Sequence, residues 1–163
     1  MQIRSVTPGD WQQIRDIRIR MTEDTPIAYL ETADAARAQT EDEWRARGTW
    51  GTAPHGLSVV AIDDAGTWVG AMGGFVHDEH GPLLVRVFVA PEVRGRQHGV
   101  ADALLTRVEE WARGEGETLT LAVHEDNPRA IAFYERRGFA LTGETEEYPL
   151  PPHGAERVVR KAV

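Results

Sequence analysis

A segment rich in glycine and arginine has the residue types and spacing that could bind a phosphate. It runs from Pro91 to Ala101 and includes Arg94, Arg96 and two glycines, with an apolar run before it and a helical stripe after it. Backbone N–H groups at the start of a helix lack partners inside the helix, and with the helix dipole they attract anions. Glycine lets the backbone approach a ligand, and arginine adds donors that match phosphate. The segment therefore predicts a diphosphate site, and a plain strand-to-helix turn with solvated arginines is the alternative.

Two better-known phosphate motifs do not describe this segment. No Gly-Lys-Ser/Thr follows it, so it is not a nucleotide P-loop. The strand before it is about the fourth of the chain, whereas the dinucleotide fingerprint follows a first strand.

A second segment, from Val123 to Phe139, is the other candidate for chemistry. Asn127-Pro128 is typical of a helix start, and Gly138 is typical of a helix end. Tyr134 lies inside this predicted helix, and a phenol with an ordinary pKa near 10 stays protonated at neutral pH. The side chain is thus either a proton donor or an amphipathic core tyrosine.

In this order, the two segments resemble the GNAT superfamily of acyl-CoA-dependent N-acetyltransferases. The Pro91–Ala101 segment resembles the superfamily's acyl-CoA-binding motif. The run Asn127…Ala130…Phe133-Tyr134-Glu135…Gly138-Phe139 resembles its next motif, and one predicted helix and one strand separate the two. The resemblance is close over residues 81–141 and extends to residues 1–80 in element order only.

The loop departs from the family pattern at one position. Family members commonly read Pro-x-x-Arg-Gly-x-Gly-x-Gly, and this chain has Gln97 where the second of these glycines is usual. A shorter family pattern is met two residues later, as Arg96-x-x-Gly99-x-Ala101. We favour the register anchored on Pro91, and the amides expected to contact phosphate differ by about two positions between the registers.

The resemblance implies that acetyl-CoA enters a wedge between two parallel strands that splay apart, here residues 83–89 and 118–123. The pantetheine arm would pair with exposed backbone near Val87 to Val89, and an N–H near Val89 would hold the oxyanion. The diphosphate would lie on the amides of residues 95–101. The implied cofactor-binding residues are Val87, Phe88, Val89, Arg94, Gly95, Arg96, Gln97, His98, Gly99, Val100, Ala101, Asn127, Phe133 and Tyr134.

Two catalytic residues are expected on the same basis. Tyr134 matches the family's usual acid for the leaving thiolate. Many relatives have a carboxylate base on the strand before the loop, but residues 83–89 contain none. Glu125, after the next strand, is therefore the candidate base, and a solvated loop acid is the alternative. His77-Asp78-Glu79-His80 is more typical of a hairpin turn than of a metal site, so no metal is expected.

The first two predicted helices would frame the acceptor side. Residues 22–43 hold seven acids and one base, Arg37, and an acidic mouth would attract a cationic amine, although a solvated helix face is the better interpretation of most of these acids. Tyr29 and Trp44 are expected to line the acceptor pocket. The alternative is that they are core residues, which would look the same in the sequence. Polyamines, amino sugars, amino acids and peptide N-termini remain open as acceptors.

The elements that must position these residues follow from hydrophobic periodicity and turn signals. Helices are expected near residues 8–24, 33–47, 100–111 and 128–137. Strands are expected at residues 2–6, 57–62, 67–76, 83–89, 118–123, 139–141 and 156–161. This order predicts an α+β fold. The resemblance implies a GNAT-like, mostly antiparallel central sheet of about seven strands, with helices on both faces and a splayed parallel pair in the middle.

Length and composition set the remaining expectations. A chain of 163 residues predicts one domain, here an acetyltransferase-like domain over residues 1–163 with acceptor-side helices at about 8–47 and an acyl-CoA-binding core at about 81–141. The absence of cysteine excludes disulfides, cysteine–zinc sites and a thiol nucleophile. A net charge of −8 disfavours nucleic acid as a partner. No apolar run would span a membrane and no signal peptide is recognisable, so a cytoplasmic location is expected. A homodimer is compatible with the sequence.

Three functions remain after these steps. The first is transfer of an acetyl group from acetyl-CoA to an amine. The second is a nonenzymatic acyl-CoA-binding or regulatory module on the same fold, which would keep the phosphate loop and dispense with proton transfer. The third, a structural or partner-binding domain, leaves the Gly/Arg segment unexplained.

Overall fold

The computed structural model describes all 163 residues and contains one seven-stranded sheet with the strand order β1-β2-β3-β4-β5-β7-β6. The strands are β1 (Gln2–Ser5), β2 (Gly56–Ile62), β3 (Trp68–His77), β4 (Gly81–Val89), β5 (Thr118–His124), β6 (Ala140–Glu147) and β7 (Ala155–Ala162). Neighbouring strands are antiparallel except β4 and β5, which are parallel. The predicted α+β class and the mixed, mostly antiparallel sheet are confirmed.

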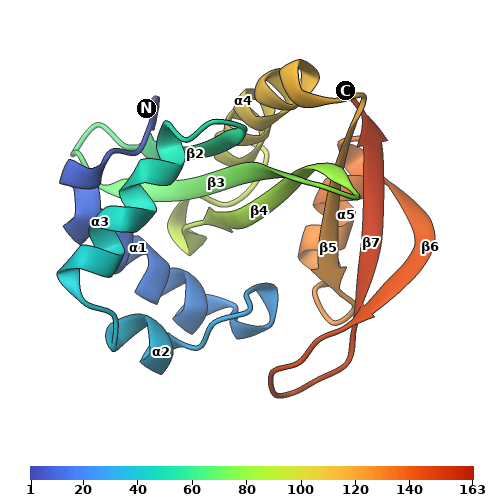
Figure 1. Cartoon of the computed structure of the whole chain (residues 1–163), viewed down its shortest axis with the longest axis horizontal. Helices are drawn as coiled ribbons and strands as arrows, with labels where there is room; N and C mark the ends of the chain where they lie inside the picture. The colour runs from blue at the N-terminus through green and yellow to red at the C-terminus, as the bar shows by residue number, and fades with distance from the viewer.

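Five α-helices accompany the sheet and cover both of its faces. They are α1 (Trp11–Asp24), α2 (Ala33–Arg37), α3 (Glu41–Gly48), α4 (Val100–Glu115) and α5 (Pro128–Arg136). In Figure 1, α1 to α3 gather beside the half of the molecule formed by β1 to β4, and α5 lies beside β5, β7 and β6. No helix of the chain combines the length and apolar character that crossing a bilayer requires.

The predicted helix over residues 33–47 is wrong in one respect, because it is two helices. α2 ends at Arg37 and α3 begins at Glu41. Thr40 starts the second helix with a capping box, in which the Glu43 N–H donates to the Thr40 hydroxyl and the Glu43 carboxylate accepts from the Thr40 N–H. The Thr-x-x-Glu signal for this boundary was present in the sequence.

The predicted strand over residues 139–141 is also wrong in extent. The structure has an eight-residue strand, β6, whose residues are mostly exposed. It pairs with β7 along its length, with a register shift between Leu141 and Thr145. Because β6 is an edge strand with little apolar alternation, its length depends on cross-strand hydrogen bonds that the sequence pattern does not reveal.

β4 and β5 separate soon after they begin. Leu83 and Thr120 form their one paired position, so the strands diverge toward their carboxyl ends. β4 also contains a bulge, because two of its residues, Arg86 and Val87, lie opposite Met72 of β3. Arg86 has a φ of 56°, a left-handed conformation that strains a non-glycine residue by about 1–2 kcal/mol. The bulge and the divergence open a wedge in the middle of the sheet.

α4 carries the Gly/Arg segment at its start and is held close against β3. Val100, Leu104 and Val108 recur at helical spacing and are fully or almost fully buried. A Cβ added at Gly74 of β3 would lie 2.4 Å from the Trp111 ring, so a glycine is required for this close approach. This packing fixes the N-terminus of α4 beside the wedge.

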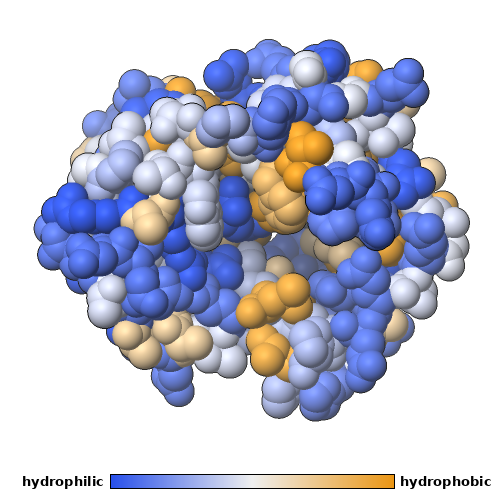
Figure 2. Space-filling model, viewed as in Figure 1, coloured by the Kyte–Doolittle hydropathy of each residue, from blue (hydrophilic) through white to orange (hydrophobic).

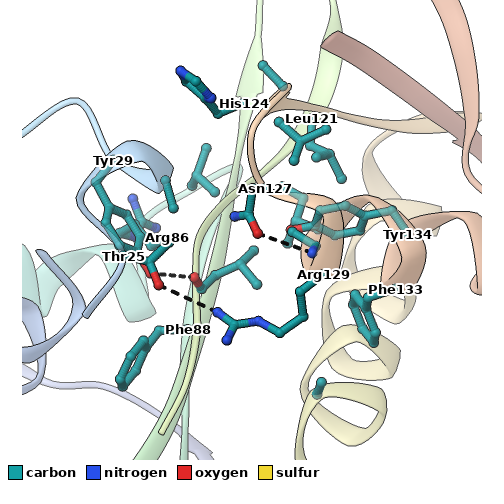
Figure 3. Close-up of a pocket in the computed structure, with 18 of the residues that line it drawn as sticks. Thr25, Tyr29, Arg86, Phe88, Leu121, His124, Asn127, Arg129, Phe133 and Tyr134 are labelled. Carbon is teal, nitrogen blue, oxygen red and sulfur yellow. Dashed lines mark hydrogen bonds between the residues drawn. The ribbon is translucent and has the colours of Figure 1, made fainter. Parts of the chain in front are cut away.

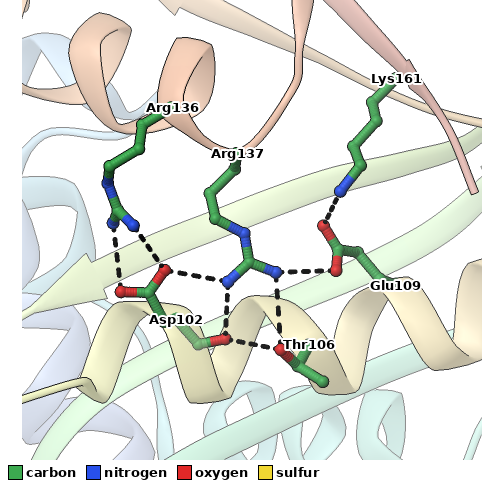
Figure 4. Close-up of polar contacts among 6 residues, drawn as sticks. All are labelled: Asp102, Thr106, Glu109, Arg136, Arg137 and Lys161. Atoms are coloured by element: carbon green, nitrogen blue, oxygen red, sulfur yellow. Dashed lines mark hydrogen bonds and ion pairs between the residues drawn. The ribbon is translucent and has the colours of Figure 1, made fainter.

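A network of charged side chains joins α4 to α5 and β7 (Figure 4). Arg137 contacts Asp102 at 2.9 Å and Glu109 at 2.8 Å, and Lys161 contacts the other Glu109 oxygen at 2.6 Å. Arg136 adds a second contact to Asp102 at 3.1 Å. The side chain of Glu109 is only 6% exposed. The network therefore couples the helix that begins at the Gly/Arg loop to the helix that carries Tyr134.

We expect Glu109→Ala to lower the free energy of unfolding by about 3 kcal/mol, because it leaves two partly buried cations without their shared carboxylate. For a domain of this size the melting temperature should fall by roughly 6–12 °C. The matched control is Glu110→Ala, which breaks an exposed pair with Arg107 and should change stability by less than about 0.5 kcal/mol. Equal stabilities of the two variants in urea titrations would contradict the prediction.

Candidate active site

A cavity of about 760 Å³ occupies the wedge between β4 and β5, within the size range of small-molecule sites. Figure 2 shows a hollow near the centre of the view, bordered above and below by hydrophobic atoms. In Figure 3, Thr25 and Tyr29 lie on one side of the pocket, and Phe133 and Tyr134 lie on the other. The two halves of the chain thus contribute opposite walls.

The backbone of β4 offers polar groups to this cavity. The Ala90 N–H donates to the Val69 carbonyl of β3 at 2.8 Å. In an antiparallel ladder neighbouring residues alternate in direction, so the N–H and C=O of Val89 face away from β3, toward the wedge. The Val89 carbonyl accepts a hydrogen bond from Arg94 Nε at 2.8 Å. Of the two backbone groups of Val89 that face the wedge, the N–H is therefore the one that remains free for a ligand.

The Gly/Arg loop brings unpaired amides to the start of α4. Gly95 and Gly99 have φ values of 105° and 66°, so both positions favour glycine. Gln97 does not have a positive φ, so the position where the family usually has glycine does not require one here. A turn is closed by a hydrogen bond from the His98 N–H to the Gly95 carbonyl at 3.2 Å. The N–H groups that make no hydrogen bond in the chain include those of Arg96, Gln97, Gly99, Val100, Ala101 and Asp102.

The two arginines of the loop differ in how they are held. Arg94 forms an ion pair with Asp24 at the end of α1 in addition to its bond to Val89. Arg96 makes no ion pair or hydrogen bond and lines the cavity. Arg96 is therefore the side chain available to an anion, and Arg94 connects the loop to the opposite wall.

Most of the residues expected to bind the cofactor line the cavity. They are Val87, Phe88, Val89, Arg94, Gly95, Arg96, Ala101, Asn127, Phe133 and Tyr134. Gln97, His98, Gly99 and Val100 do not line it, although the unpaired amides of three of them lie in the same loop and first helical turn.

Tyr134 projects from α5 toward the pocket, and its hydroxyl makes no hydrogen bond in the chain (Figure 3). Its ring packs against the rings of Phe133 and Phe139, with centroids 5.4 and 5.6 Å away. Burial, and to a smaller extent Tyr29, raises the pKa of the Tyr134 hydroxyl. The group is therefore protonated at neutral pH and available as a hydrogen-bond donor. Asn127 caps α5, because its side-chain oxygen accepts from the Ala130 N–H at 3.3 Å.

The two aromatic residues expected at the acceptor side have different environments. Tyr29 lines the cavity, and its hydroxyl donates to the Val87 carbonyl at 2.7 Å, so this β4 carbonyl already has a partner. The prediction for Trp44 is wrong. Its side chain is 1% exposed, lies outside the cavity and packs beneath the Arg47 guanidinium at 4.7 Å, as a core residue does.

The expectation for Glu125 also needs correction. Glu125 is exposed and does not line the cavity. Its side chain accepts from the Ala155 N–H at 3.1 Å, and its own N–H donates to the Ala155 carbonyl at 2.9 Å. It holds the end of β5 to the start of β7 and lies away from the wedge.

Sequence reasoning missed the acids that do line the cavity. Glu144, Glu146 and Glu156 reach it from β6 and β7. Glu156 lies directly opposite Glu146 on one side and His124 on the other. Burial, followed by the charge of Glu146, raises the pKa of Glu156. Only the register of the last two strands identifies this pair, and no local sequence pattern indicates that register.

His124 is buried at the end of β5 and both its ring nitrogens have partners. Nε2 lies 2.7 Å from the His153 carbonyl, and Nδ1 accepts from the Asp126 N–H at 3.1 Å. Because a carbonyl can only accept a hydrogen bond, the ring proton is assigned to Nε2. Nδ1 carries no proton, because it accepts the hydrogen bond from the Asp126 N–H. Both ring nitrogens of His124 are thus occupied by backbone partners, so it offers no free nitrogen as a base.

The acidic mouth expected from residues 22–43 is largely neutralised in the structure. Arginines from this and other segments bind most of these acids. The pairs are Glu23–Arg37, Asp24–Arg94, Glu31–Arg18, Glu31–Arg47, Asp34–Arg37 and Glu41–Arg45.

Comparison with known proteins gives a consistent result. Residues 11–139 match the family model described as the acetyltransferase (GNAT) family. The chain is 36% identical over 97 residues to the peptidyl-lysine N-acetyltransferase YjaB of Salmonella typhimurium, and the match covers 56% of this chain and 59% of that protein.

Solved structures share the fold. A GNAT-family acetyltransferase from Streptococcus pneumoniae superposes with a TM-score of 0.83 at 18% identity, covering 99% of this chain and 98% of the other. The phosphinothricin acetyltransferase of Sinorhizobium meliloti, in complex with AcCoA, superposes with a TM-score of 0.78 at 20% identity, covering 99% and 88%.

Proposed function

Because the chain belongs to the GNAT family of acetyltransferases, we propose that it moves an acetyl group from acetyl-CoA to the primary amine of a small molecule or peptide. The observation that carries the proposal is the convergence of three features on one cavity. These are the free Val89 N–H, the unpaired amides at the start of α4 and the Tyr134 hydroxyl without a partner.

Acetyl-CoA would lie along the wedge with its diphosphate on the unpaired amides of the loop and the first turn of α4, which include those of Arg96, Gly99 and Ala101. Unpaired N–H groups at a helix start suit an anion, and the Arg96 side chain adds charge-assisted donors. Its pantetheine arm would run beside β4, where Val89 presents its N–H. The AcCoA complex of the Sinorhizobium meliloti protein, which has the same fold, supports acetyl-CoA as the donor.

In the proposed reaction, the nitrogen of the neutral amine attacks the thioester carbonyl carbon and a C–N bond forms. The carbonyl oxygen becomes negative, and the Val89 N–H stabilises it. The C–S bond then breaks, and Tyr134 donates its proton to the departing thiolate. The proton lost by the amine passes to Glu156, directly or through water, because this acid lines the cavity and its raised pKa makes it a better base. The products are an amide and coenzyme A.

The alternative is a module that binds acyl-CoA and catalyses nothing. It would need the amides of the loop but not the Tyr134 hydroxyl or the cavity acids. A protein that binds acetyl-CoA and transfers to no amine would support this alternative.

We expect acetyl-CoA to raise the melting temperature of the protein. At 100 times the dissociation constant, ligand binding stabilises the folded state by about 2.7 kcal/mol, which corresponds to roughly 5–10 °C for a domain of this size.

Arg96→Glu should weaken acetyl-CoA binding by about ten- to a hundredfold, the scale of a charge-assisted hydrogen bond. Thermal scans and titration calorimetry measure the two effects.

Arg113→Glu is the matched control, since this exposed arginine lies on the last turn of the same helix and makes no ion pair. It changes the net charge equally and should leave the affinity within about twofold, because exposed charges beyond a Debye length of roughly 8–10 Å are screened. No thermal shift at saturating acetyl-CoA would refute the proposed donor. Equal weakening by both variants would place the diphosphate elsewhere.

A further inference from the structure

Two arginines bind a single carboxylate beside the cavity, and a third arginine lies near them. Arg18 of α1 binds Glu31 through Nε at 2.6 Å, and Arg47 of α3 binds it at 2.7 Å. Arg86, at the bulge of β4, makes no ion pair, and its Nη2 donates to the Leu57 carbonyl at 3.1 Å. The side chains of Arg18, Arg47 and Glu31 are 13%, 17% and 12% exposed. The cluster therefore holds two more positive charges than negative charges in a poorly hydrated place.

Several guanidinium nitrogens of this arginine cluster have no partner. Arg18 Nη1 and Arg86 Nε are buried without a hydrogen bond. Arg18 Nη2 and Arg86 Nη1 also make no hydrogen bond and are not enclosed, so they remain available to a ligand. Unpaired buried donors are rare in folded proteins and destabilise them.

Arg86 shows the energetic consequence. Burial, followed by the charges of Arg18 and Arg47, lowers the pKa of its guanidinium to about 10. The group is still protonated at neutral pH, but it is destabilised in a strained, left-handed backbone position. No acid of the chain offsets its charge. An anion that entered the cavity would do so.

The cavity reaches this cluster, because Arg18 and Arg86 both line it. Both belong to elements before the wedge, α1 and β4, and Figure 3 shows Arg86 on the side of Tyr29. The half after the wedge contributes Glu146 and Glu156, which lie opposite each other on paired strands. Like charges in that position repel, and an ammonium group would relieve the repulsion. The acids of β6 and β7 therefore lie in the same cavity as Arg18 and Arg86, although the half after the wedge also contributes Arg129 and Arg136 to the lining.

We propose that the acceptor is a small zwitterion, a primary amine that also carries an anionic group bound by Arg18 and Arg86. This inference rests on the proposed acetyl transfer and names its substrate class. A carboxylate suits the site best, because its two oxygens match the planar fork of a guanidinium, and a phosphonate shares that chemistry. A polyamine or a lysine side chain offers nothing to the unpaired guanidinium nitrogens. The zwitterion replaces the cationic amine expected from the composition of residues 22–43.

Binding of matched ligands to the coenzyme A-saturated protein tests the proposal without requiring turnover. The probes are α-amino acids, the amines made by removing their carboxylates, and aminophosphonates of equal length, each titrated by calorimetry. We expect at least one amino acid or aminophosphonate to bind tenfold or more tightly than its carboxylate-free amine. Arg86→Met should abolish this difference and leave the affinity for coenzyme A unchanged.

The controls separate recognition from stability. Arg86→Met removes no ion pair and should leave the melting temperature unchanged or raise it, because the buried uncompensated charge disappears. Arg15→Met, at a partly exposed position on α1 outside the cavity, should keep the wild-type preference. The comparison of ligand pairs on the wild type needs no variant at all.

Equal or weaker binding of the anionic partner in every pair, or binding of none of the probes, would overturn the inference. A preference that survives Arg86→Met would overturn it as well, since another group would then hold the anion. These outcomes differ from failure of the proposed function, which appears as absent acetyl-CoA binding or as absent transfer to an amine that binds.

Discussion

Tyr134→Phe is expected to lower kcat by about 10²-fold and to leave acetyl-CoA affinity nearly unchanged. The variant removes one hydroxyl and retains the ring that packs against Phe133 and Phe139. That hydroxyl lines the cavity and makes no hydrogen bond in the chain, so its loss should affect proton donation to the thiolate and not folding. Steady-state kinetics and calorimetry with acetyl-CoA measure the two quantities.

Tyr148→Phe is the matched control for loss of a buried hydroxyl. The Tyr148 hydroxyl lies 2.6 Å from the Tyr29 carbonyl and 3.0 Å from the Pro26 carbonyl, so its removal leaves buried acceptors unpaired. We expect this variant to lose about 1–3 kcal/mol of stability, whereas Tyr134→Phe loses none. Full activity of Tyr134→Phe would mean that water or another group protonates the thiolate.

Glu156→Gln is expected to lower kcat/KM by about 10²-fold at neutral pH, the lower end for a general base. Burial and the charge of Glu146 raise the pKa of this carboxyl, and the base acts only when it is ionised. In the wild type, the rate should therefore fall as the pH drops through a value above the usual glutamate range. The variant should lack this acid limb, because glutamine does not titrate.

Two neighbouring variants sharpen the test. Glu146→Gln removes the charge that helps to raise the pKa of Glu156, so the acid limb should move to lower pH. Glu125→Gln alters an acid outside the cavity and should leave the limb in place. A Glu156→Gln enzyme with the wild-type pH profile would show that another group accepts the proton.

The candidate site could be predicted in part from the sequence. Gly95, Gly99 and Asn127-Pro128 are local signals, because glycine permits a positive φ and Asn-Pro starts a helix within a few residues. Those signals indicated the family, and the match of residues 11–139 to the family model confirms it. Most of the cofactor-binding residues that the resemblance implied also line the cavity. Tyr134 belongs to the same local motif, and its catalytic role stays a prediction.

The wedge, the base and the acceptor side depend on contacts between distant segments. No local pattern in the sequence distinguishes Glu125 from Glu156. Only the pairing of β5, β7 and β6 directs Glu156 into the cavity and Glu125 away from it. The acids near the first helices predicted an acidic mouth, but charge at a site depends on which side chains meet in space. Arg94, which pairs with Asp24, comes from the loop before α4.

The sequence by itself determined the element order, the helix starts and the Gly/Arg loop, because each depends on backbone preferences and hydrophobic spacing over a few residues. Tertiary structure alone decided that Arg18 and Arg47 bind one carboxylate with Arg86 near them, and that Glu146 and Glu156 line the same cavity as Arg18 and Arg86. Electrostatic interaction depends on distance and burial, and neither quantity for residues far apart in the chain is encoded in local spacing.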